Sequence, residues 1–324
     1  MLGRVGLIVS LAWLVGCGDD GKGGAAGGAA GSAGAAGSTG AAGTAGAATP
    51  ANKMMFDTGE FEVPAGDSFT CFYTSTYTDR ELSVGSASGS QGPGGHHILV
   101  FYTDAPRDPQ YHPCNDAEMT SWHQIAGSAG QDMRGEVLGL PDGLALKVPA
   151  GKQLVIQAHY INTSAAAKKV HDTVTLNLVA AANVKSYVNY FVTNDDKFEV
   201  PAHATGYVSR TLCNVEQDLQ VALTLGHMHE YGKHYQLEII DANDQVLQTL
   251  RSDDWTEEFT SHPPITKYGM QQPLLLERGM RLRQTCTWDN TSDQPLLFPR
   301  EMCLSFMYYF PGMGQDLDCK MTKL

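Results

Sequence analysis

The residues with the clearest capacity for chemistry lie in the stretch Leu225-Gly226-His227-Met228-His229. On an extended segment, side chains two positions apart point to the same face, so His227 and His229 would form a clamp for a metal ion. Met302, in the later stretch Glu301-Met302-Cys303, offers a thioether. Two imidazoles and a thioether make a soft ligand set, which favours copper, and Cu(I) especially, over zinc or magnesium.

A second group of histidines, His96, His97 and His159, offers nitrogen ligands only. Adjacent side chains on a regular strand face opposite ways, so His96 and His97 can share one metal only if their strand starts irregularly. The preceding Gly92-Pro93-Gly94-Gly95 allows that. Each motif alone has a plain alternative, since histidine pairs are often surface or core residues and a single methionine is usually core packing. Two unlike copper sites would indicate redox chemistry with oxygen.

The elements that must position these residues are strands. Runs rich in β-branched and aromatic residues, bounded by Gly, Pro, Asn or Asp, predict strands at 98–102, 153–162, 173–180, 220–229, 235–240, 280–288 and 304–310. Asp241-Ala242-Asn243-Asp244 predicts a hairpin loop between two of them. No long segment has a helical period, so the sequence predicts an all-β architecture of sandwiches. A polar break after a strand places a domain boundary near residue 183, which gives domains at 52–183 and 184–324.

Length and composition fit two folded domains with a targeting segment in front. The chain has 324 residues, 42% of them hydrophobic, enough for two domains with real cores. Its formal net charge of −13 argues against a nucleic-acid partner and mainly indicates solubility.

The first 17 residues have the pattern of a bacterial lipoprotein signal peptide. Arg4 precedes a short apolar run, and Leu14-Val15-Gly16-Cys17 has the form of a lipobox. Cys17 would then be lipidated and would anchor the protein to a membrane of the bacterial cell envelope, on its periplasmic side or at the surface. The alternative is an ordinary cleaved signal. Residues 18–51 are almost all Gly, Ala, Ser and Thr, which predicts a flexible tether without a core.

Six of the seven cysteines remain once Cys17 is set aside: Cys71, Cys114, Cys213, Cys286, Cys303 and Cys319. An even number in an exported protein predicts three disulfides, although spacing alone leaves fifteen pairings open. None of them has the close Cys-x-x-Cys spacing of a zinc site.

Four segments, in order, resemble the copper type II ascorbate-dependent monooxygenases, the family of peptidylglycine α-hydroxylating monooxygenase and dopamine β-monooxygenase. They are Gly94-Gly95-His96-His97, Gln157-Ala158-His159-Tyr160, His227-Met228-His229 and Glu301-Met302-Cys303. The resemblance runs from about Lys53 to the C-terminus. It implies two jelly-roll-like β-sandwich domains that face each other across a cleft.

The resemblance also implies two copper ions per chain with separate roles. His227, His229 and Met302 would hold the catalytic copper, where O2 is activated, and His96, His97 and His159 would hold a copper that stores and delivers an electron. It implies the disulfides Cys71–Cys114, Cys213–Cys319 and Cys286–Cys303, the last beside Met302. The implied reaction is hydroxylation of a C–H bond of a small organic substrate with O2 and ascorbate or a similar reductant. The rival hypothesis is a non-catalytic periplasmic copper-binding lipoprotein that buffers copper.

The sequence departs from the peptide-amidating members at the positions that hold a peptide carboxylate. An Arg, an Asn and a Tyr in those enzymes correspond here to Leu225, Leu304 and Phe306. Burying a carboxylate against such residues would cost several kcal/mol. Glycine-extended peptides are therefore not expected as substrates, and a neutral or apolar carbon centre fits better.

The other histidines are assigned smaller roles. His234 is a candidate for supporting the His227–His229 clamp, and His112 and His123 are candidates for supporting the first cluster. We expect His171, His203 and His262 at the surface.

Overall fold

The computed structural model describes residues 52–115, 118, 121–129, 139–260, 262–298 and 300–324. The signal segment with Cys17 and the tether up to residue 51 lie outside the described residues. Strands dominate the described chain, joined by loops and two short 3-10 turns, η1 (Ala181–Asn183) and η2 (Glu257–Thr260). Multiple sheets pack as sandwiches, so the prediction of an all-β sandwich protein is confirmed. Within the described ranges, no helix is long and apolar enough to cross a bilayer.

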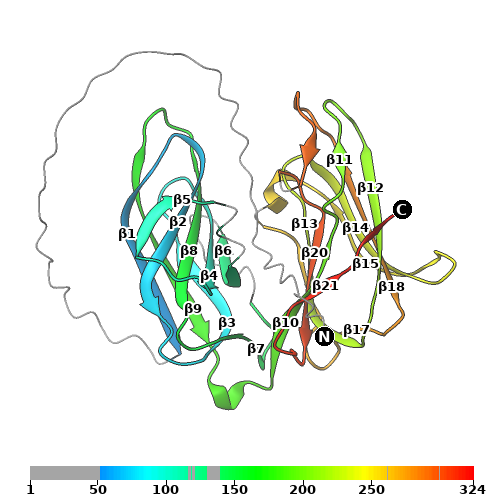
Figure 1. Ribbon diagram of the computed structural model, residues 1–324, viewed down its shortest axis with the longest axis horizontal. Helices are drawn as coiled ribbons and strands as arrows, with labels where there is room; N and C mark the ends of the chain where they lie inside the picture. Colours follow the sequence, from blue (N-terminus) through cyan, green and yellow to red (C-terminus); the bar gives the residue numbers. More distant parts are fainter. Residues whose placement is uncertain (1–51, 116–117, 119–120, 130–138, 261, 299) are drawn as a thin grey trace, which may run out of the picture.

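The first half of the chain stacks two sheets (Figure 1). Its first sheet contains β1 (Lys53–Val63), β9 (Lys168–Leu178), β3 (Leu82–Ser90) and β7 (Leu144–Val148), in that order. The second has the order β5 (Gln110–Pro113), β2 (Gly66–Tyr77), β8 (Gln153–Asn162), β4 (Gly95–Thr103) and β6 (Trp122–Ala129). The strands β4 and β8, which carry the first histidine cluster, are therefore neighbours in the interior of this sheet.

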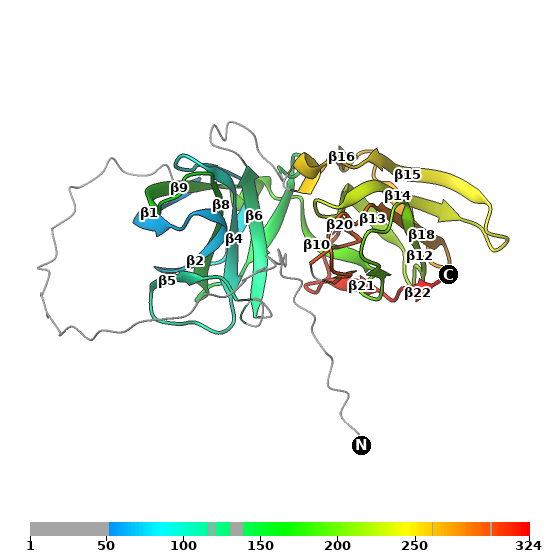
Figure 2. The same ribbon diagram turned by 90° about the horizontal axis from the view of Figure 1, so that it is seen from above.

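The second half is built in the same way from the remaining strands (Figure 2). One sheet contains β10 (Ser186–Asn194), β20 (Leu304–Phe310), β13 (Leu219–His227), β16 (Ile265–Lys267), β17 (Leu274–Leu276) and β21 (Leu317–Cys319). The other has the order β15 (Val246–Asp254), β14 (Gly232–Ile240), β18 (Arg281–Trp288), β12 (Tyr207–Asn214) and β22 (Thr322–Lys323). A two-stranded ribbon pairs β11 (Glu199–Val200) with β19 (Leu296–Leu297).

The two halves are joined through their backbones. β7 pairs in parallel with β10, with Leu144 opposite Ser186 and Leu146 opposite Val188, and this makes one ten-stranded sheet across both halves. The predicted boundary near residue 183 falls in the connection between β9 and β10, which contains η1.

β20 separates two apolar cores. Every residue of this strand is buried, and its side chains alternate between the cores as strand geometry requires. Leu304, Phe306 and Tyr308 lie in a core that also contains side chains of the first half, such as Ile98 and Leu146. Met307 and Tyr309 face the core inside the second half. The halves therefore share buried apolar surface as well as a sheet.

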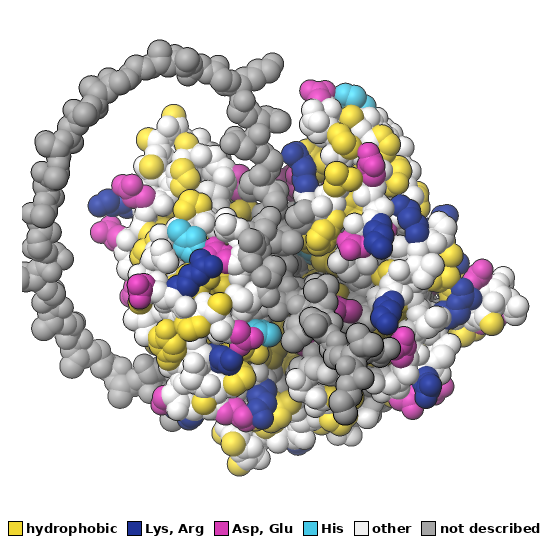
Figure 3. All heavy atoms as spheres, viewed as in Figure 1, with side chains coloured by type: hydrophobic (Ala, Val, Ile, Leu, Met, Phe, Trp, Pro, Cys, Tyr) yellow, Lys and Arg dark blue, Asp and Glu magenta, His cyan; other side chains and the backbone are white. Residues whose placement is uncertain are grey.

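The seven strands predicted from the sequence are all present, and the hairpin loop at 241–244 joins β14 to β15. The predicted strand at 220–229 ends two residues early, because β13 stops at His227 and His229 lies in the following turn. Strands with a weaker apolar pattern, such as β1 and β12, were not predicted. Acidic and basic side chains are interspersed on the face shown in Figure 3.

Candidate metal centres

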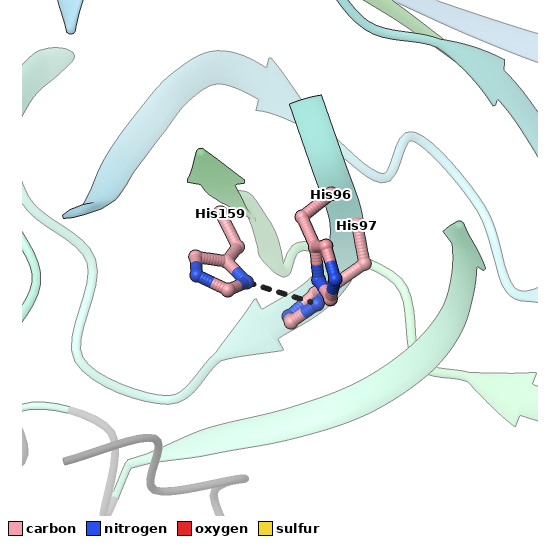
Figure 4. A group of neighbouring side chains, drawn as sticks. All are labelled: His96, His97 and His159. Carbon is pink, nitrogen blue, oxygen red and sulfur yellow. Dashed lines mark hydrogen bonds between the residues drawn. The ribbon is translucent and has the colours of Figure 1, made fainter. Parts of the chain in front are cut away.

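The first histidine cluster forms where two neighbouring strands meet. His96 and His97 lie at the start of β4 and His159 lies on β8, directly opposite His97. One nitrogen from each ring can be chosen so that all three lie within 4.8 Å of one another. Figure 4 shows the rings converging, with the Nδ1 atoms of His97 and His159 3.4 Å apart.

An irregular strand start brings the adjacent His96 and His97 together. The β4–β8 register shifts between Gly95 and His97, which leaves His96 as the extra residue of a bulge. Gly94 adopts a φ of 93°, a left-handed conformation that favours glycine. The ring centroids of His96 and His97 consequently lie 5.8 Å apart instead of on opposite faces. The irregularity that a shared metal requires is present.

His159 is held in one orientation by residues of β2. Its Nε2 lies 2.6 Å from Asp67 Oδ1, and its ring stacks on Phe69 at a centroid distance of 4.0 Å. An Nε2–H donated to this carboxylate leaves the lone pair on Nδ1, the atom that faces His97. Carboxylate–histidine pairs of this kind commonly orient metal ligands.

Burial favours the neutral form of the His96 and His97 imidazoles. It lowers the pKa of His96 to about 4, and the neighbouring His159 and His262 rings lower it further while Asp67 opposes them. Burial also lowers the pKa of His97 well below its usual value, with contributions from His159, His96 and His227. Neutral rings at pH 7 carry the lone pairs that a metal needs.

The second cluster begins where β13 ends. His227 is its last residue, and His229 follows in the turn with its ring centroid 5.1 Å away. His229 Nδ1 lies 2.7 Å from the Arg300 carbonyl oxygen, to which it donates, so the lone pair is on Nε2. Among the described residues, no side chain or backbone group hydrogen bonds to that buried Nε2. Burial lowers the pKa of His229 to about 4 and that of His227 well below its usual value.

Met302 belongs to the segment that leads into β20, the strand beside β13. β13 and β20 are antiparallel, with His227 opposite Leu304. Beyond this pair, the backbone N–H groups of His229 and Met302 both donate to Glu301 Oε2, which brings the two backbones together. Met302 itself lies just before β20 and is buried. The disulfide Cys286–Cys303 ties the next residue to β18.

Glu301 connects the histidine turn to the methionine segment, and sequence reasoning gave it no role. Its Oε2 accepts hydrogen bonds from the backbone N–H groups of His229 and Met302 and from Trp288 Nε1, at 3.1, 3.1 and 2.8 Å. Its Oε1 accepts the Tyr231 N–H at 3.0 Å. Burial raises the pKa of the Glu301 carboxyl to about 8, although these donors favour the ionised form.

The structure contains the three disulfides that the family resemblance implies. Cys71 pairs with Cys114, Cys213 with Cys319 and Cys286 with Cys303.

The three apolar residues at the carboxylate-binding positions are all buried. Leu225, Leu304 and Phe306 belong to the core shared by the two halves, and they lie on the same β13–β20 pair as His227. The neighbourhood of this cluster is therefore apolar on that side.

Most of the remaining histidines pair with carboxylates away from the two clusters. His123 bonds Asp104 and lies opposite Tyr102, at the far end of β4 from His96. His112 bonds the buried Glu118, and His234 bonds Asp254. His171 and His203 are exposed and pair with Asp57 and Asp293, in line with the predicted surface positions.

His262 is the exception, because it was expected at the surface and is half-buried beside the first cluster. Its ring centroid lies 6.0 Å from that of His96, although it belongs to the other half of the chain. The two prolines that follow it and the absence of a strand pattern gave no signal of this contact.

Comparison with known proteins covers the second half of the chain. Residues 186–323 match the model of the family described as copper type II ascorbate-dependent monooxygenase, C-terminal domain. The matched range includes His227, His229 and Met302, and it excludes the first histidine cluster. No curated protein matches the chain.

Proposed function

We propose that this chain, which belongs through residues 186–323 to the copper type II ascorbate-dependent monooxygenase family, hydroxylates a C–H bond of a small organic substrate. O2 supplies the oxygen atom, and ascorbate or a similar reductant supplies two electrons. With two protons, the products are the alcohol and one water. The observation that carries the proposal is the convergence of His96, His97 and His159 in one half of the chain. In the other half, the His227 and His229 rings lie 5.1 Å apart, and Glu301 joins the backbones of His229 and Met302.

Both donor sets fit copper. His96, His97 and His159 offer three imidazoles, and His227, His229 and Met302 offer two imidazoles with a soft thioether. Copper held there would supply one-electron redox chemistry with O2 and the reductant. The clusters also lie close enough for His227 to contribute to the lowered pKa of His97, which favours electron transfer between them.

The chain's own residues orient the ligands and select the substrate. Asp67 fixes one tautomer of His159, and the Arg300 carbonyl fixes one tautomer of His229. Glu301 holds the turn of His229 against the segment of Met302. Leu225, Leu304 and Phe306 give no partner to a carboxylate, so we propose a neutral or apolar carbon centre as the reacting group.

Copper counting tests the ligand assignment. The full chain should bind two copper ions, and Met302→Ile should weaken copper binding at the second cluster while the first cluster keeps its ion. Met307→Ile, in the core of the second half, is the matched control for loss of a buried thioether. One copper ion or none in the unmodified chain would contradict the two-site assignment.

Oxygen uptake separates the enzyme from a copper buffer. With ascorbate present, uptake should depend on an added organic substrate, and label from ¹⁸O2 should enter the product alcohol. Two bound copper ions without substrate-stimulated uptake across a broad panel would favour the buffering protein instead.

We also propose that Cys17 carries a lipid anchor in the bacterial cell envelope. The lipobox Leu14-Val15-Gly16-Cys17 and the tether at 18–51 support this. The mature protein should partition into the detergent phase of a two-phase extraction, and Cys17→Ser should move it to the aqueous phase. Aqueous partitioning of the unmodified protein would contradict the anchor.

A further inference from the structure

His262 reaches the first histidine cluster from the opposite half of the chain. It follows η2, the short turn on the side of the second half that faces the first half in Figure 1. Its backbone N–H bonds the Glu258 carbonyl at 2.9 Å, and the buried Pro263 comes next, so the backbone around this ring is constrained. His262 is also among the groups that lower the pKa of both His96 and His97, in agreement with its position beside His96.

The side chain lacks the partner that a buried imidazole nitrogen normally has. His262 Nδ1 is buried, and no hydrogen bond to it is formed within the described ranges. The other histidines outside the two clusters bond carboxylates, as His234 does with Asp254. Burying a polar atom without a hydrogen bond is costly, so a buried unpaired nitrogen in contact with a metal-type cluster points to a ligand.

The spacing of the His96 and His262 rings is compatible with two imidazoles on one metal ion. With metal–nitrogen bonds of about 2 Å, two such rings have centroids roughly 4.5 Å apart at right angles and roughly 6.4 Å apart when opposite. Within the cluster the centroid distances are 5.8 Å for His96–His97, 4.9 Å for His96–His159 and 4.8 Å for His97–His159. The His96–His262 distance of 6.0 Å lies near the value for opposite ligands. His262 is not among the residues whose nitrogens already lie within 4.8 Å of one another, so its ring would turn toward the ion on binding.

We propose that His262 is a fourth imidazole ligand of the copper at His96, His97 and His159, which makes this site span both halves of the chain. The inference rests on copper binding at this cluster, which is part of the proposed function. Four nitrogen donors suit the tetragonal geometry of Cu(II), whereas three suffice for Cu(I). The fourth ring would therefore favour the oxidised ion at this cluster, and the ion would connect η2 to β4.

Counting imidazoles on the copper tests this directly. In the full chain carrying His227→Ala and His229→Ala, one equivalent of Cu(II) should occupy the first cluster alone. Pulsed EPR should then detect four coupled imidazoles. Adding His262→Phe should reduce the count to three and raise the Cu(II) dissociation constant at least roughly tenfold.

His203→Asn is the matched control, because the exposed His203 side chain pairs with Asp293 on the same half and asparagine tolerates the left-handed backbone at this position, with a φ of 58°. It should leave both the count and the affinity unchanged. A count of three before His262 is altered overturns the inference and leaves copper binding at the cluster intact. If no Cu(II) binds at the cluster, the proposed function fails at this site together with the inference. Since the first count is made with His262 in place, it holds even if His262→Phe folds poorly.

Discussion

At the scale of single residues, one histidine in each cluster is oriented by a hydrogen bond to the ring nitrogen that would not bind the metal. Asp67 does this for His159, and the Arg300 carbonyl does it for His229. The result is a ring held in a fixed orientation before any ion arrives. Such groups commonly change metal affinity by roughly 10- to 100-fold when removed.

At pH 9, where the Glu301 carboxyl is ionised, Glu301→Gln should damage both stability and copper binding at the second cluster. Four N–H groups donate to this carboxylate. In the glutamine variant the amide NH2, itself a donor, would face some of these N–H groups, and their hydrogen bonds would be lost. We expect the free energy of unfolding to fall by about 1–3 kcal/mol. The copper dissociation constant of this cluster should rise roughly 10-fold or more.

Chemical denaturation and competition titration measure the two effects. Glu62→Gln, at an exposed position on β1, serves as the control. Unchanged stability and affinity in Glu301→Gln would show that the four hydrogen bonds do not support the site.

The lowered histidine pKa values make the metal-free protein sensitive to acid. A histidine with a pKa of 6.5 when unfolded and about 4 when folded binds its proton first in the unfolded chain. Stability should therefore fall as the pH drops from about 6.5 toward 4. Glu301 acts in the opposite direction, because its folded pKa of about 8 lies above 4.5, so it favours the folded state as the pH falls.

Melting temperatures of the metal-free protein between pH 7 and 5 measure this dependence. The variant with His227→Phe and His229→Phe should show a shallower decrease, because two of the affected rings are gone. An equal slope in both proteins would contradict the assignment of the lowered pKa values to these histidines.

Residue types and spacing were enough to select both ligand sets from the sequence, but not the residues that support them. In the sequence, Glu301 stood out only as part of the Glu-Met-Cys stretch. The neighbouring residues do not indicate that this glutamate is fully buried and accepts four hydrogen bonds. His262 was missed for a related reason, because its contact with His96 joins residues 166 positions apart, in different halves.

At the scale of elements, glycines set the position of both clusters. A Cβ on Gly95 would lie 2.3 Å from Gln91 Cβ, and a Cβ on Gly226 would lie 2.4 Å from the Tyr235 ring. Real Cβ atoms do not approach that closely, so the strand start before His96 and the strand end before His227 both require glycine.

Gly95→Ala and Gly226→Ala should each remove a different copper ion. The first should displace His96 and His97, and the second should displace His227, so each variant acts as the control for the other. Copper stoichiometry should fall from two to about one in both, with the surviving ion identified by its EPR spectrum. Two ions bound by either variant would contradict the structural role of that glycine.

The strands themselves were readable because β-branched and aromatic runs between turn residues are a local property. The early end of β13 could not be predicted from the local sequence, because His229 leaves the strand to bond Arg300, a residue far along the chain. The bulge at His96 was anticipated from the glycines, although its register shift depends on the partner strand β8.

At the scale of the whole molecule, the core that contains Leu225, Leu304 and Phe306 also contains side chains of the first half, such as Ile98 and Leu146. Since neither half can expose its part of this core cheaply, we expect one cooperative thermal transition for the metal-free protein. Differential scanning calorimetry measures it. Two resolved transitions, one for each half, would contradict the shared core.

The backbone pairing of β7 with β10 has a consequence for any attempt to divide the chain. A fragment that begins near residue 186 would carry β10 with its edge uncovered at residues 186–188, next to the apolar outer face of β20. Open edges beside apolar surface are templates for aggregation. The second half, although it matches a family domain by itself, should therefore form insoluble material when expressed alone and remain soluble when the first half is supplied with it.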